Sequence, residues 1–343
     1  MTRGLAHLRH ETRAAFAPRS GGGRSFGRSG AHRPLTLWSL VAVLVGAADG
    51  RSAVAAGFDL DFFKPTTPTT GTFCEENGFT VERGRLDVAL TTQYSHRPLV
   101  LRDQKTAMTG GDVVRDRLTG FVTAAFGVTD RIDAGGRLAM VLHQTGDVDV
   151  DLSDGGGGVP GPPRAREIGD TDLFLRVTLL RPEPERHRDV RFRLTLTAGL
   201  GIPTGARDAL AGSGKVSFRP RLTAGWQTDR WSAAGSAGYV FRSVVEIPSS
   251  RLVVGDAVVA GAGFACAIIP GRLWLEGEIS TSVGVSDSQT GAGSVATQLI
   301  AGPRVILPGE LVLQAGAGGG LNHEAGSPRA AAVITLGRAF GAP

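Results

Sequence analysis

Apolar and polar side chains alternate along most of the chain, and the clearest example runs from Val190 to Ile202. Its even-numbered positions are all apolar, whereas the odd-numbered positions hold Arg, Thr or Gly. A period of two is typical of a β-strand with one apolar and one polar face. These 13 residues exceed a common soluble strand and match a tilted strand that crosses a bilayer, which needs about 9–11 residues.

The same alternation recurs and predicts about twelve strands. The links between them alternate between short ones, such as 129–131, and long ones, such as 144–169. Short periplasmic turns and longer extracellular loops are typical of outer-membrane barrels. Strands that cross a bilayer must close on themselves, because lipid satisfies no free backbone N–H or C=O group. The strands are expected at residues 86–94, 113–128, 132–143, 170–180, 190–202, 216–227, 231–242, 256–268, 272–284, 296–307, 311–321 and 329–340.

The predicted fold class is therefore all-β: a closed, antiparallel, up-and-down transmembrane β-barrel of about twelve strands over residues 86–340. An even number of strands places both ends of the barrel on the periplasmic side. Residues 57–85 contain Pro65, Pro68 and a cluster of Thr and Gly, and we expect them to form an irregular N-terminal segment.

Residues 1–56 are typical of a signal peptide with an overlong basic n-region. The 14-residue apolar run 35–48 follows Arg33 and is too short to span a membrane as a helix. Ala53 and Ala55 supply a small-x-small cleavage site, and the absence of a twin arginine favours the Sec route.

The basic charge of the chain resides in this leader. Residues 1–56 hold eight Arg and two acidic residues, and the remainder carries 29 basic and 30 acidic residues. A nearly neutral body lacks the electrostatic footprint of nucleic-acid binding. We therefore expect no nucleic-acid partner.

Charged residues on the polar faces are expected to point into the lumen, because arginine facing lipid at mid-membrane costs about 2–4 kcal/mol. Five arginines and three acidic residues form the predicted lumen cluster. We favour an ion-paired lattice over the alternative, an anion-selective constriction, because a twelve-stranded barrel is narrow. The cluster comprises Arg176, Arg191, Arg193, Arg219, Arg221, Asp172, Glu276 and Glu278.

Aromatic residues beside the short turns predict an interfacial girdle. These residues are Phe126, Phe192, Trp226 and Trp231. Trp274 does not fit this pattern, because its position in the strand points it into the lumen beside Glu276.

The loop after the strand at 132–143 carries Asp147, Asp149, Asp151 and Asp154. These carboxylates make a weak divalent-cation candidate, but the spacing of an EF-hand is absent and a solvated loop is favoured. The sequence points to no catalytic residue, no further metal site and no cofactor, so we do not expect an enzyme. The two cysteines, Cys74 and Cys266, are expected to be isolated, although a disulfide between them stays open.

Three short stretches carry a family resemblance: residues 94–101 (YSHRPLVL), the step Gly169-Asp170 that opens a strand, and residues 200–205 (LGIPTG) before a Gly-rich loop. They resemble the N-terminal barrel domains of OmpA-family proteins and the transporter-like outer-membrane barrels of the phenol-degradation meta-pathway type. The resemblance covers about residues 57–343. Many OmpA-family proteins carry a C-terminal peptidoglycan-binding domain, whereas this chain ends with its last predicted strand.

Together these features predict an outer-membrane β-barrel that serves as a passive pore or transporter for small solutes. Two alternatives stay open: a structural envelope barrel with an occluded lumen, and a secreted soluble β-sandwich or adhesin. The expected partners are outer-membrane lipid, lipopolysaccharide and, during biogenesis, the outer-membrane assembly machinery. The run 333–340 (VITLGRAF) resembles the aromatic-ended terminal strand that this machinery recognises.

Overall fold

The computed structural model describes residues 60, 63–102, 109–146, 166–181, 190–207, 209–247, 252–285, 295–322 and 326–341. The proposed signal peptide and the loop aspartates Asp147, Asp149, Asp151 and Asp154 lie outside these residues. No helix in the described part of the chain is long and apolar enough to cross a membrane.

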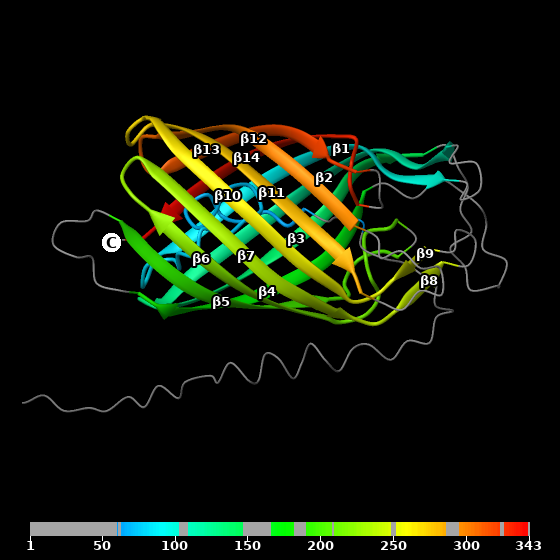
Figure 1. Cartoon of the computed structure of the whole chain (residues 1–343), viewed down its shortest axis with the longest axis horizontal. Coiled ribbons are helices and arrows are strands. Elements are labelled where there is room, and N and C mark those ends of the chain that lie inside the picture. The colour runs from blue at the N-terminus through cyan, green and yellow to red at the C-terminus, as the bar shows by residue number, and fades with distance from the viewer. Residues whose placement is uncertain are drawn as a thin grey trace, which may run out of the picture. The chain divides into compact units, whose positions relative to one another are not determined.

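Twelve antiparallel strands close into one barrel, and two short strands pair separately within a long link (Figure 1). Around the barrel the order is β1-β14-β13-β12-β11-β10-β7-β6-β5-β4-β3-β2. The barrel strands are β1 (Leu86–Arg102), β2 (Thr109–Thr129), β3 (Ile132–Thr145), β4 (Glu167–Leu180), β5 (Arg191–Ile202), β6 (Ser217–Gln227), β7 (Trp231–Arg242), β10 (Ala257–Ile269), β11 (Leu273–Gly284), β12 (Val295–Leu307), β13 (Leu311–Gly320) and β14 (Ala330–Phe340). The separate pair is β8 (Val245–Ile247) and β9 (Leu252–Val254).

The predicted fold class is confirmed, and all but two of the limits of the barrel strands agree with the expected ones or lie within three residues of them. The main differences are at the long-loop end, where β1 continues to Arg102 and β2 begins at Thr109. The alternative of a soluble sandwich is wrong, because the twelve strands form one sheet that closes where Leu86 of β1 pairs with Phe340 of β14.

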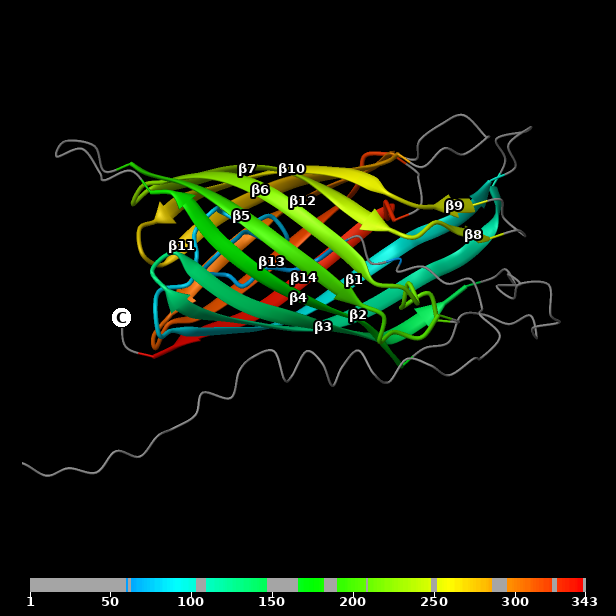
Figure 2. The same ribbon diagram turned by 90° about the horizontal axis from the view of Figure 1, so that it is seen from below.

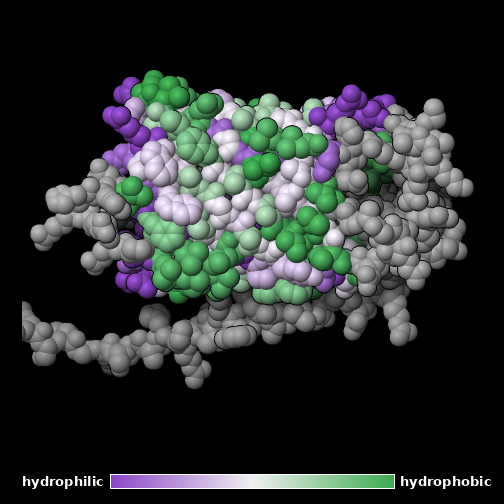
Figure 3. Space-filling model, viewed as in Figure 1, coloured by the Kyte–Doolittle hydropathy of each residue, from purple (hydrophilic) through white to green (hydrophobic). Residues whose placement is uncertain are grey.

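The inside and outside of the barrel are reversed relative to a soluble protein. In β5, Leu196 and Leu200 are exposed, whereas Thr195 and Thr197, on either side of Leu196, are buried. Strand β14 alternates between exposed and buried over its whole length. On the face in Figure 3, apolar and weakly polar side chains cover the middle of the barrel and hydrophilic ones gather toward its ends. This pattern fits a wall surrounded by lipid, with its polar groups turned inward.

Residues 63–85, which we call the plug, run through the inside of the barrel before β1 begins (Figures 1 and 2). The described segment begins at the end with the long loops, where the amide of Leu60, just before the plug, donates to the Leu210 carbonyl. It reaches the short-turn end at Arg83, which forms a parallel bridge with Gly127. Both ends of the barrel wall lie at the short turns as expected, but the segment that precedes the wall crosses the whole lumen.

Candidate functional site

The inner wall and the plug together form the candidate functional site. On the side of β3 and β4, Arg176 Nε lies 2.7 Å from Asp133 Oδ1, and both side chains are almost fully buried. Asp133 also accepts a hydrogen bond from the Val81 amide of the plug. A buried ion pair of this kind is strongly destabilised when one partner is removed. The pair therefore links β3 and β4 to Val81, near the short-turn end of the plug.

Asp172 of β4 is the centre of a second group, in which three cations surround one carboxylate. Arg219 Nη2 lies 2.8 Å away, Arg137 Nη1 3.3 Å and the plug's Lys64 Nζ 3.7 Å. Arg137 also donates to the Pro65 carbonyl of the plug. This part of the wall therefore has more positive than negative charge.

Glu278 of β11 holds the turn of the plug. Its Oε2 accepts hydrogen bonds from Thr72 Oγ1 at 2.7 Å and from the backbone N–H groups of Phe73, Cys74 and Glu75 at 2.9–3.0 Å. Cys74 Sγ donates to the other carboxylate oxygen at 2.8 Å. Among the described residues, no cation forms an ion pair with Glu278. The carboxylate is stabilised by converging backbone amides, as at an anion-binding nest.

Glu276, two residues earlier, has partners on the wall. It pairs with Arg304 of β12 and accepts a hydrogen bond from Gln314 Nε2 at 2.8 Å. The Arg304 guanidinium also lies over the Trp274 ring, 5.6 Å from its centroid. This contact gives a physical reason for the inward-facing tryptophan, since a cation above an indole face is stabilised by the ring quadrupole.

The remaining predicted lumen arginines differ in their surroundings. Arg221 pairs with Glu75 of the plug, and Arg193 lies 4.6 Å from the centroid of the plug's Phe79 ring. Arg191 does not join the cluster, because its side chain is 54% exposed at the short-turn end, 3.9 Å from Asp229. The sequence pattern shows on which face a residue lies but not how deep in the barrel, so Arg191 was placed too far inside.

Sequence reasoning missed several partners in the lumen. Asp133 and Arg137 lie on the polar face predicted for β3, but nothing in the sequence shows which arginine or carboxylate each meets. Glu75 lies in a segment with no periodicity and pairs with a residue 146 positions away. The plug itself has no sequence signal beyond its cluster of Thr, Gly and Pro.

The predicted girdle residues lie toward the short turns. Phe126, Trp226 and Trp231 are exposed, and the Phe192 and Trp226 rings lie 5.2 Å apart. A second aromatic group, which the sequence analysis did not identify, lies toward the long loops. There the ring centroids of Phe218 and Phe241 are 6.1 Å apart, and those of Tyr239 and Phe241 are 4.4 Å apart. Two such levels are typical of a barrel that spans a membrane.

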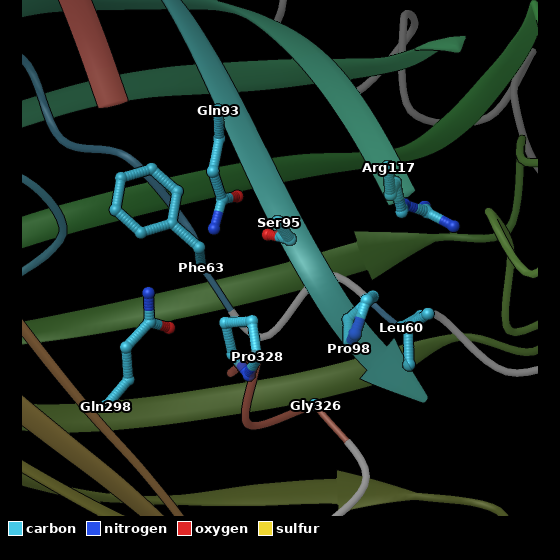
Figure 4. A pocket seen from close by; sticks show the side chains of 9 residues that line it. All are labelled: Leu60, Phe63, Gln93, Ser95, Pro98, Arg117, Gln298, Gly326 and Pro328. Carbon is cyan, nitrogen blue, oxygen red and sulfur yellow. The ribbon is translucent and has the colours of Figure 1, made fainter. Parts of the chain in front are cut away.

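A small polar cavity lies near the long-loop end of the plug (Figure 4). Gln93, Ser95 and Gln298 contribute polar groups to its lining, and Phe63 contributes an aromatic ring. Gln298 Nε2 is buried without a hydrogen-bond partner among the described residues. The plug therefore leaves some space at this end of the lumen.

Both cysteines are free. Cys74 is in the lumen, whereas Cys266 belongs to the outward row of β10, beside the exposed Phe264 and Ile268. Within the described ranges, no three His, Cys, Asp or Glu side chains are arranged to hold a metal ion.

Comparisons with known proteins bear on the fold and the family of this chain. No curated protein matches the chain in sequence. The COG4313 outer membrane channel from Pseudomonas putida F1 has 13% sequence identity and a TM-score of 0.56, and the match covers 77% of this chain and 98% of that one. The Ralstonia pickettii toluene transporter TbuX has 14% identity and a TM-score of 0.35, with 76% and 90% of the two chains covered.

The first of these matches confirms the outer-membrane barrel fold. The comparisons do not confirm the resemblance to OmpA-family domains. The other resemblance is confirmed, because a family model matches residues 102–336. The chain belongs to the family described as putative MetA-pathway of phenol degradation.

Proposed function

We propose that the protein is an outer-membrane channel for small solutes and that the plug closes it. The observation that carries this proposal is the chemistry of the plug's contacts. Many are hydrogen bonds and ion pairs to the wall, through Glu278, Asp133, Arg137 and Arg221. Water can solvate these charged and polar groups when the plug leaves, so the net stabilisation from each contact is limited to about 1.5–3 kcal/mol. Displacing the plug exposes an inner wall that is polar except for an apolar patch, where Phe121, Ile300 and Val333 pack with Phe63 and Phe73 of the plug.

The solute class follows from the family description, which refers to phenol degradation. Small aromatic compounds are therefore the first solutes to test. Location in the outer membrane and export through a signal peptide belong to the same proposal. The second candidate function, a structural barrel with an occluded lumen, is favoured by the number of elements that the plug contacts, from β3 at Asp133 to β11 at Glu278. The two functions differ in one respect: a channel requires the plug to move.

A reversible disulfide between plug and wall tests this motion. Cys74 Sγ lies 4.0 Å from Ser280 Oγ of β11, so Ser280→Cys places a second thiol beside the native one. The change is made in a Cys266→Ser background, and a chain that also carries Cys74→Ser is the control that cannot form the bond.

The assay is ion conductance in planar bilayers before and after reduction. We expect no conductance when the disulfide is formed, channel openings after reduction, and no redox effect in the control. Zero conductance in every state, including Glu278→Gln, would support the occluded structural barrel. Equal conductance with and without the disulfide would show that the plug does not close the channel.

A further inference from the structure

The plug places one of its own carboxylates in a niche of the barrel wall. Glu75 is almost fully buried. Its Oε2 accepts a hydrogen bond from Ser236 Oγ of β7 at 2.7 Å and lies 3.3 Å from Arg221 Nη1 of β6. A hydroxyl and a guanidinium that converge on one carboxylate are a common means of binding an organic anion.

Glycine residues of β10 leave room for a flat carboxylate beside the strand backbone. Gly261 of β10 lies directly opposite Ser236 in the sheet. A β-carbon built on Gly261 would overlap the carboxylate of Glu75, and one built on Gly263 would lie 3.1 Å from Thr72 Oγ1. Only glycine at residue 261 lets a planar carboxylate lie this close to the strand backbone.

The positive charge of Arg221 also favours an anion in this niche. Among the described residues, Glu75 is the only carboxylate that pairs with Arg221. Glu278 of β11 lies nearby, but it accepts hydrogen bonds from plug amides and, among the described residues, forms no ion pair with Arg221. When the plug is displaced, Arg221 and Ser236 face the lumen and their carboxylate leaves with the plug.

We propose that Arg221, Ser236 and Gly261 form a binding site for the carboxylate of a small organic acid, and that Glu75 occupies this site in the closed barrel. The inference rests on the proposed channel function and names a solute class for it. A solute that binds the displaced-plug state better than the closed state shifts the population toward the former. The solute acid therefore competes with Glu75 and promotes opening.

The thiol of Cys74 reports this displacement, because in the closed state it is half-buried and donates a hydrogen bond to Glu278 Oε1. The assay measures the rate at which a water-soluble maleimide modifies Cys74 in the full barrel, in detergent, with Cys266→Ser as background. The probe is sodium benzoate, and the control is benzamide, its uncharged isostere, at equal ionic strength in sodium chloride. We expect benzoate to accelerate labelling about tenfold at ten times its Kd, and benzamide to have no effect.

Substitution of Arg221 locates the effect. Arg221→Gln also removes the partner of Glu75, so its basal labelling rate is expected to rise. The decisive quantity is therefore the ratio of the rates in benzoate and benzamide, which should fall to one. The matched control is Arg193→Gln, which removes another arginine that contacts the plug but meets an aromatic ring there, and which should keep the benzoate effect.

Equal rates in benzoate and benzamide for the unsubstituted barrel would overturn the carboxylate site, as would a benzoate effect that survives Arg221→Gln. Neither result would affect the channel function itself. That function is tested separately by the disulfide between residues 74 and 280.

Discussion

Removal of the charge on Glu278 should release the plug. In Glu278→Gln the side chain keeps its size, but one acceptor oxygen becomes an N–H donor that faces the backbone amides of the plug. In the structure, Oε2 accepts from Thr72 Oγ1 and from three backbone N–H groups. Hydrogen bonds to a charged acceptor contribute about 1.5–3 kcal/mol each, against about 0.5–1.5 kcal/mol for neutral ones.

A loss of about 1 kcal/mol in each of three of these bonds weakens plug docking by about 3 kcal/mol. Since about 1.4 kcal/mol is a factor of ten, the displaced state should become about 100-fold more populated. Maleimide labelling of Cys74 should accelerate by a similar factor, because labelling from a rapidly exchanging open state follows its population.

The matched control is Glu276→Gln, on the same strand and the same inner face. Glu276 accepts from Arg304 and Gln314 of the wall and makes no contact with the plug that the structure records. The Glu276→Gln substitution should therefore change the rate of Cys74 labelling far less than Glu278→Gln does. If Glu278→Gln labelled at the unsubstituted rate, or if both substitutions had equal effects, the assignment of Glu278 as the anchor of the plug would be wrong.

Three further substitutions test the wall and the niche. Leu196→Arg places a charge on the lipid-facing side of β5 and should lower the free energy of unfolding in lipid vesicles by about 2–4 kcal/mol; an unchanged value would contradict the membrane orientation. Arg176→Gln leaves the buried Asp133 without its cation and should cost about 3–5 kcal/mol, seen as a lower temperature of heat modification on gels. Gly261→Val overlaps the carboxylate of Glu75 and should accelerate thiol labelling; labelling at the original rate would show that the niche tolerates a side chain.

The barrel wall could be predicted from the sequence because the alternation within each strand shows which of its faces is apolar and which is polar. In β5 the apolar even positions face outward and the polar odd positions inward, and one alternating stripe defines both faces. The limits of β5 are recoverable for the same reason, since the alternation stops where the turns begin. Closure between β1 and β14 followed from the rule that no open edge survives in lipid.

The plug could not be predicted in this way. Its backbone follows no period, and its contacts join residues that are distant in sequence, such as Cys74 and Ser280. The interior charges were predicted as a set, but their pairing depends on where strands lie around the barrel. The depth of Arg191 was misjudged because alternation carries no information on the position along the barrel axis.

Hydrogen exchange of the plug amides is the most direct test of whether the plug moves. In the closed state the amides of Phe73, Glu75 and Val81 are bonded to Glu278 or Asp133 and should be protected. For the barrel in lipid, we predict that these amides exchange much faster than those of β5 and β14, and that the disulfide between residues 74 and 280 slows them selectively. Exchange of plug and wall amides at the same slow rate, with no effect of the disulfide, would contradict a displaceable plug and identify a permanently filled barrel.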